Sequence, residues 1–172
     1  LPIRWALITF CLTLSLSAAM TYVSSTMIEG ATFWVALSVL VVLILLGVLF
    51  DMLGVAVTSA SQAPFVAMAS KKVKGAKNSL LVLKHAEKFS NFCNDVVGDI
   101  CGVVSGTAGA ALAALATAQF GFLPAAFWSV ATSAVISAMT VSLKDLGKGV
   151  AINQSKQIVE MIGKILAVFI RK

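Results

Sequence analysis

The chain has 172 residues, of which 59% are hydrophobic and only 12% are charged, with a net charge of +6. Soluble globular domains carry about 25% charged residues. This composition therefore excludes an ordinary water-soluble domain and indicates a surface that contacts lipid. The length fits one domain, so we expect a single transmembrane domain over residues 1–172. The apolar runs predict an all-α, polytopic membrane protein with about four transmembrane helices and basic amphipathic helices beside the membrane.

Two apolar helices are expected in the first third of the chain. The first covers residues 5–23; a secretory signal peptide is the alternative, because Ser-Ala-Ala at 17–19 resembles a cleavage site. We favour a retained membrane helix, followed by a short polar turn over 22–30. The second, Thr32–Phe50, supplies 19 residues, close to the ~20 that span the hydrocarbon core. Small residues continue it toward Pro64, where a helix would break or kink.

The second half of the chain alternates basic and apolar segments. Residues 71–88 hold six lysines with interleaved valine and leucine, a pattern typical of an amphipathic helix on a membrane surface; a solvated charged loop is the alternative. Two more membrane helices are predicted over 89–118 and 125–143, joined by an uncharged turn at 119–124. A last basic amphipathic segment covers 148–172.

The positive residues predict the orientation of the helices. The segments 71–88 and 148–172 hold eleven of the thirteen lysines and arginines, and the other two predicted turns hold none. Cytoplasmic loops are the positively charged ones. We therefore expect both termini in the cytoplasm, and a plasma membrane, most simply a prokaryotic inner membrane, as the location. Such basic segments bind anionic lipid in preference to nucleic acid.

Three aspartates interrupt the apolar helices. An aspartate at the centre of a membrane helix costs about 2.5–3.5 kcal/mol on insertion scales, so Asp51, Asp95 and Asp99 point to a function. Asp95 and Asp99 are four residues apart and share one helix face. We expect all three to converge in the cytoplasmic half of the bilayer, with Asn91 and Asn94 adding amide oxygens. Oxygen ligands of this kind suit a hard ion such as Mg²⁺ or Na⁺; protonated structural acids are the alternative.

Small residues form a second pattern in the third membrane helix. Gly98, Gly102 and Gly106 are spaced by four, a pattern that permits close approach of another helix or subunit. We interpret it as a packing face.

The fourth membrane helix carries a hydroxyl ladder of Ser133, Ser137 and Thr140, with helix packing as its alternative function. The one histidine, His85, lies in the lysine-rich segment. No serine–histidine–acid set, phosphate-binding glycine loop or zinc motif occurs in the sequence. We therefore expect no enzyme.

Three stretches resemble the membrane domain of the CorC/cyclin M (CNNM) magnesium transporter family. LFDMLGVAVTSAS (49–61) resembles its first-helix signature. The lysine-rich stretch followed by AEKFSNFCNDVVGDICGVVSG (86–106) resembles its basic helix and second membrane helix, and TVSLKDLGKGVAI (140–152) resembles the end of its third. The likeness covers a core of 31–172, with helix 5–23 as an addition. It implies a dimer with an acidic cavity that binds Mg²⁺ through side-chain oxygens, and sodium-driven export.

The chain departs from that family at several positions. Asp51 falls where the family has a serine, and Asp99 where it has an asparagine. The family's glutamate in the first motif is Gly54 here, and Lys144 lies near its second acid. The regulatory nucleotide-binding CBS pair of the family is not in this sequence.

These patterns leave three functional hypotheses. The first is a transporter of a divalent cation, Mg²⁺ before others, that binds the ion through intramembrane aspartates. The second is a membrane scaffold that binds a partner or anionic lipid without transport. The third is a proton-coupled carrier of another solute.

Overall fold

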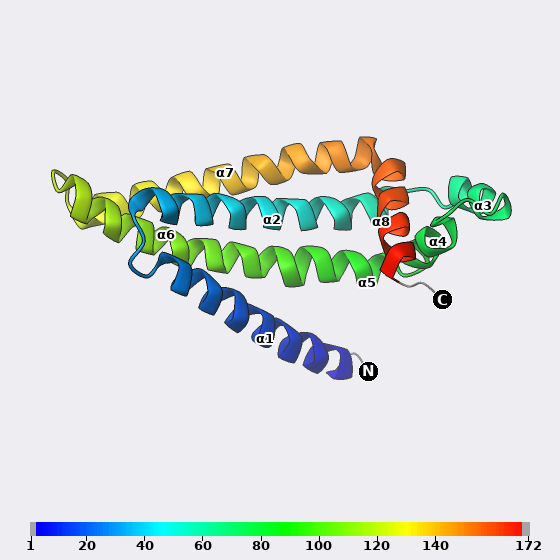
Figure 1. Ribbon diagram of the computed structural model, residues 1–172, viewed down its shortest axis with the longest axis horizontal. Coiled ribbons are helices and arrows are strands. Elements are labelled where there is room, and N and C mark those ends of the chain that lie inside the picture. The colour runs from blue at the N-terminus through cyan, green and yellow to red at the C-terminus, as the bar shows by residue number, and fades with distance from the viewer. Residues whose placement is uncertain (1–2, 170–172) are drawn as a thin grey trace. The chain divides into compact units, whose positions relative to one another are not determined.

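A computed structural model describes residues 3–169, and every regular element in that range is a helix. In chain order the helices are α1 Ile3–Ile28, α2 Phe33–Ser59, α3 Ala63–Ser70, α4 Ala76–Lys84, α5 Ala86–Asn91, the π-helix η1 Phe92–Gly98, α6 Asp99–Phe120, α7 Ala125–Asn153 and α8 Ser155–Phe169 (Figure 1). The all-α prediction is confirmed.

Four helical runs are long and apolar enough to cross a membrane: Ala6–Ile28, Phe33–Ser59, Ala86–Phe120 and Ala125–Asn153. These are the four predicted from the sequence. The predicted break near Pro64 is also present, because α2 ends at Ser59 and the proline lies in the first turn of α3.

Two predicted helix ends are wrong. The polar turn expected over 22–30 is helical as far as Ile28, and the hydroxyls of Ser25 and Thr26 are satisfied within α1 by hydrogen bonds that they donate to carbonyls three residues earlier. The fourth helix does not end at Leu143. It continues as α7 to Asn153 through charged residues that end the apolar run without ending the backbone hydrogen bonding.

The chain divides into two compact units, where the sequence suggested one domain. Unit 1 comprises residues 1–48 and 96–143, and unit 2 comprises residues 49–95 and 144–172.

Unit 1 is built on α6. Helix α1 packs along it, and α2 approaches it closely at Gly47, where an added Cβ would lie 3.0 Å from the Cβ of Cys101. Helix α7 contacts it at Gly109, where an added Cβ would overlap the side chain of Ile136. The glycines that bring these helices together are therefore Gly47 and Gly109.

An aromatic cluster joins three helix ends in unit 1. Phe33 of α2 meets Phe120 of α6 edge-on with ring centroids 5.7 Å apart, and Phe120 stacks on Trp128 of α7 at 5.6 Å. Aromatic residues are enriched at the two interfaces of a membrane. The cluster lies near the two predicted turns that hold no lysine or arginine, as expected for one such interface.

Unit 2 has a core of its own between α3, α4 and α8. Its buried apolar residues are Val57, Phe65, Val82, Leu83, Val159 and Ile162. The contact between α4 and α8 is close, because Gly163 faces the backbone of Gly75 and Ser79. The buried Ser79 hydroxyl donates a 3.0 Å hydrogen bond to the carbonyl of Val159.

The lysine-rich segment is only partly the helix that we predicted. A turn over 71–75 precedes α4, with Lys72 and Gly75 at φ values of 55° and 88°. Helix α4 then begins at Ala76 and buries Val82 and Leu83, while all six lysines of the segment are exposed. An amphipathic pattern is present, but its apolar face packs on the rest of unit 2.

Candidate functional site

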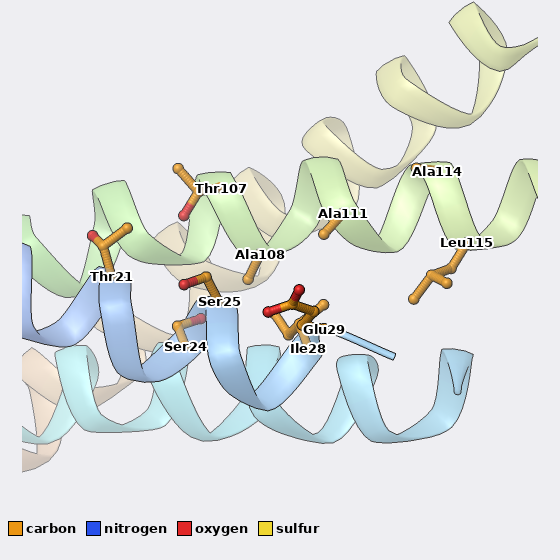
Figure 2. Close-up of a pocket in the computed structure, with 10 residues that line it drawn as sticks. All are labelled: Thr21, Ser24, Ser25, Ile28, Glu29, Thr107, Ala108, Ala111, Ala114 and Leu115. Carbon is orange, nitrogen blue, oxygen red and sulfur yellow. The ribbon is translucent and has the colours of Figure 1, made fainter. Parts of the chain in front are cut away.

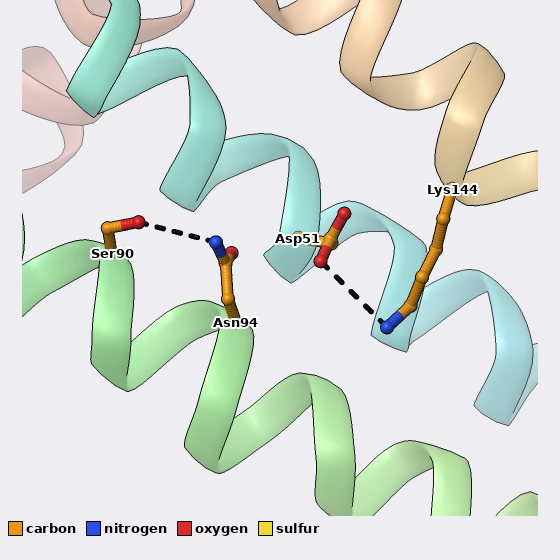
Figure 3. A network of polar contacts seen from close by, with 4 residues as sticks. All are labelled: Asp51, Ser90, Asn94 and Lys144. Carbon is orange, nitrogen blue, oxygen red and sulfur yellow. Dashed lines mark hydrogen bonds and ion pairs between the residues drawn. The ribbon is translucent and has the colours of Figure 1, made fainter. Parts of the chain in front are cut away.

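A buried ion pair in unit 2 is the first part of the candidate site. Asp51 of α2 is 6% exposed. Its Oδ1 lies 3.8 Å from the Nζ of Lys144 in α7, whose side chain is 24% exposed (Figure 3). The second carboxylate oxygen, Oδ2, is buried and has no hydrogen-bond partner among the described residues. One carboxylate oxygen of Asp51 therefore lies near a positive charge, and the other has no hydrogen-bond partner among the described residues.

Asn94 contributes a second buried oxygen to the same unit. Its Nδ2 donates a hydrogen bond of 3.3 Å to the hydroxyl of Ser90, as Figure 3 shows. Its Oδ1 is buried and, within the described part of the chain, also has no partner. Asn94 therefore holds its amide in place with the nitrogen and leaves the carbonyl oxygen as an acceptor.

Gly54 places this amide beside the aspartate. It follows Asp51 by three residues, so both lie on one face of α2. A Cβ added to Gly54 would overlap the carboxamide of Asn94. The amide consequently lies against the α2 backbone at a position three residues along the helix from Asp51, whose carboxylate is directed toward Lys144 (Figure 3). The absence of a side chain at Gly54 makes room for the Asn94 amide.

The π-helix η1 presents Asn94 to this face. Seven residues, Phe92–Gly98, form it between α5 and α6. π-Helical segments are rare and are frequent at functional sites. Asn94 is partly buried in it and its neighbour Asp95 is exposed. Hydropathy and small-residue spacing carry no signal for such a segment, so sequence reasoning missed it.

The chemistry of this site suits a hard cation. Its acceptors are carboxylate, carboxamide and hydroxyl oxygens. Mg²⁺ is commonly bound by one or two carboxylates and keeps several of its waters, whereas structural zinc sites use thiolate and imidazole ligands. Two buried oxygens without partners are free to accept an ion or its waters, so the residues present fit such an ion.

The predicted meeting of three aspartates is wrong. Asp95 and Asp99 are exposed while Asp51 is buried, and Asn91 is also exposed. In residues 3–169, no group of three or more histidine, cysteine, aspartate or glutamate side chains could hold a metal ion. Asp95 lies in η1 and Asp99 begins α6, and the exposure of both side chains shows that they turn away from the buried side of this helical run.

Only Gly98 of the predicted small-residue face packs on another helix of the described chain, where its carbonyl oxygen would lie 3.9 Å from a Cβ on Gly47 of α2. Gly98 is buried, but a Cβ on Gly102 or Gly106 would meet no atom of the described chain within 4 Å. Close helix approach within unit 1 occurs at Gly47 and Gly109 instead.

The hydroxyl ladder is likewise turned outward. Ser133 and Ser137 are exposed, and Thr140 is only partly buried. These residues therefore supply no ligands to a buried site in this chain.

Unit 1 contains a separate pocket between α1 and α6 with a volume of about 480 Å³. Alanines and Leu115 line its α6 side, and Glu29 extends into it from the end of α1 (Figure 2). Two hydroxyls in its wall, Ser25 and Thr107, donate to carbonyls of their own helices. With one carboxylate among mostly apolar walls, this pocket is a poor metal site.

Comparison of the chain with protein-family models, with characterised proteins and with solved structures gives no match. The resemblance to the CorC/cyclin M family therefore stays a prediction that depends on the residues themselves.

Proposed function

We propose that this chain is an integral membrane protein that binds and translocates a cation at the site of Asp51 and Asn94, with Mg²⁺ as the first candidate. Its four long apolar helices support membrane insertion. The observation that carries the cation proposal is the pair of buried, partnerless oxygens, Asp51 Oδ2 and Asn94 Oδ1.

The energetic argument concerns these two oxygens. A buried polar group without a partner costs about 1–3 kcal/mol, and the cost is larger for a charged carboxylate. An ion that binds these oxygens, or binds them through its waters, would remove this cost. A partly hydrated Mg²⁺ would be held by the Asp51 carboxylate and the Asn94 carbonyl, directly or through its waters.

Several finer features belong to the same proposal. The CorC-like assignment, a homodimer, sodium coupling and an inner-membrane location with both termini cytoplasmic are mutually consistent. Their support is the motif resemblance and the distribution of lysines. Exchange of Mg²⁺ would follow if the helices bearing Asp51 and Asn94 moved relative to each other.

Thermal stability in detergent tests the proposal. A ligand at 100 times its dissociation constant adds about 2.7 kcal/mol to the stability of the protein, or about 5–11 °C in midpoint for a chain of this size. Millimolar Mg²⁺ should raise the midpoint of the wild type, with choline chloride as the ionic-strength control. The Asp51→Asn variant should lose the effect, and Asp95→Asn should keep it. A wild type unaffected by Mg²⁺, Mn²⁺ and Na⁺ would rule out the proposed site.

A scaffold function is the second candidate, and the open face of α6 favours it. Gly102, Gly106 and the 62% exposed Val103 lie uncovered by the described chain. A small-residue face of this kind suits packing against a second membrane helix. The scaffold hypothesis predicts that light scattering of the purified protein will detect a dimer and that Gly102→Leu will be monomeric. It also predicts that Asp51→Asn leaves dimer formation intact.

Anionic lipid is a proposed partner of either function. Helix α8 exposes Met161, Ile165 and Val168 together with Lys156 and Lys164. Apolar and basic residues on the exposed side of one helix suit a membrane surface that carries negative headgroups.

A further inference from the structure

Lys144 is the feature of the site that cation binding alone does not explain. A permanent positive charge beside the ligand of a cation opposes binding of that cation. Yet Lys144 is the residue that faces the buried Asp51, at 3.8 Å. The lysine must either block the site or leave it when the ion enters.

The contact is loose enough to be broken. Charge-assisted hydrogen bonds between ammonium and carboxylate have lengths of about 2.7–2.9 Å, so 3.8 Å is an ion pair without a well-formed hydrogen bond. The Lys144 side chain is also 24% exposed, whereas that of Asp51 is 8% exposed. The ammonium therefore has a route out of the site that the carboxylate does not have.

The net charge of the site also indicates that Lys144 must move when a cation binds. Asp51 and Lys144 together are neutral, so the pair is compatible with burial when no ion is present. Addition of Mg²⁺ with the ammonium still in place would leave two uncompensated positive charges in a region of low dielectric, which is strongly unfavourable. Occupancy by the ion and contact with Lys144 are therefore mutually exclusive.

We propose that Lys144 is a tethered counter-ion, which neutralises Asp51 in the ion-free state and must be displaced when a free cation binds. This inference depends on the proposed function, because it assigns a competitor to the same site. The lysine sets the ion concentration at which the site fills, and it protects the buried carboxylate between binding events.

The test compares the Mg²⁺ concentration that gives half of the maximal rise in thermal midpoint for four purified full-length proteins. These are the wild type, Lys144→Met, Lys144→Arg and Lys148→Met. Lys148 is an exposed lysine one turn further along α7, so its variant is the matched control for the loss of one positive charge. Lys144→Gln replaces Lys144→Met if the methionine variant does not yield folded protein.

Removal of the competitor should lower the half-maximal Mg²⁺ concentration at least ten-fold in Lys144→Met. It should also lower the midpoint in metal-free buffer, because Asp51 then has no counter-charge. Lys144→Arg should keep a half-maximal concentration no lower than that of the wild type, and Lys148→Met should match the wild type.

The two proposals fail in different ways. Equal half-maximal concentrations in the wild type and Lys144→Met would overturn the counter-ion role and leave the cation site standing. The titration extends to 20 mM Mg²⁺ by design. If Lys144→Met responds in this range and the wild type does not, the counter-ion role is supported and ion binding by the native chain is contradicted. No response in any protein would overturn both.

Discussion

The contact between α4 and α8 allows one prediction to be worked out from the structure in detail. Gly163 of α8 packs directly on α4. A Cβ at this position would overlap the Ser79 hydroxyl and would lie 2.7 Å from the Gly75 carbonyl oxygen and 3.0 Å from the Ser79 backbone nitrogen. Because two of these atoms belong to the backbone, a rotamer change cannot relieve the overlap. Gly163→Ala must push the helices apart.

The expected cost follows from three effects. Overpacking a well-packed contact costs about 1–3 kcal/mol. A weakened hydrogen bond from Ser79 to Val159 costs about 1 kcal/mol more. Replacement of a helical glycine by alanine returns about 1 kcal/mol. We expect Gly163→Ala to destabilise the protein by about 1–3 kcal/mol, which lowers the thermal midpoint by about 2–12 °C.

Gly149 provides the matched control. It lies in α7, in the same unit, and a Cβ there would meet no atom of the described residues within 4 Å. Gly149→Ala should therefore gain about 0.5–1 kcal/mol from helix propensity and raise the midpoint by about 1–4 °C. The two variants are chemically identical substitutions with opposite expected signs.

The assay is heat-induced loss of the monodisperse peak on size-exclusion chromatography in detergent. Hydrogen exchange should in addition report faster exchange in α4 and α8 of Gly163→Ala. The double variant Ser79→Ala/Gly163→Ala should be less destabilised than the sum of its single changes, because one clashing atom is gone. If Gly163→Ala proves as stable as Gly149→Ala, α4 and α8 do not pack closely at Gly163.

Three further predictions concern single side chains. A Cβ in Gly54→Ala meets only side-chain atoms of Asn94, so the thermal midpoint should stay within about 2 °C of the wild type. The half-maximal Mg²⁺ concentration in the thermal assay should rise, because the amide is displaced. An unchanged concentration would exclude Asn94 as a ligand. Ser79→Ala should destabilise the protein by about 1 kcal/mol, because its hydrogen bond to Val159 is lost, and circular dichroism melts should show a lower midpoint. An unchanged midpoint would show that this hydrogen bond does not contribute to stability. Asp95→Asn should change neither stability nor the Mg²⁺ response, since its side chain is exposed; loss of Mg²⁺-dependent stabilisation in this variant would restore Asp95 as a ligand.

The long helices could be predicted from the sequence because their signal is local. Apolar runs of sufficient length and the proline at position 64 decide where membrane helices lie and where one ends, with little help from other parts of the chain. Helix ends set by backbone hydrogen bonding were less predictable. The apolar run ends near Leu143, but α7 continues to Asn153, since charged residues do not prevent a helix from continuing.

The sequence singled out three aspartates in the apolar helices, but it did not show which of them is buried or what each one contacts. Periodicity shows that Asp95 and Asp99 share a face, yet it does not show whether that face turns toward another helix or away. Only packing decides this, and it buries Asp51 and leaves the other two exposed.

What the sequence by itself determined is therefore the helical class and the four apolar spans. Tertiary structure alone decided that Asp51 faces Lys144, 93 positions later in the chain, that Asn94 rests on Gly54, and that Gly163 touches α4. The physical reason is the range of the interactions. Hydropathy and helix propensity act over one or two turns, whereas an ion pair or a close helix contact depends on which distant faces the folded chain brings together.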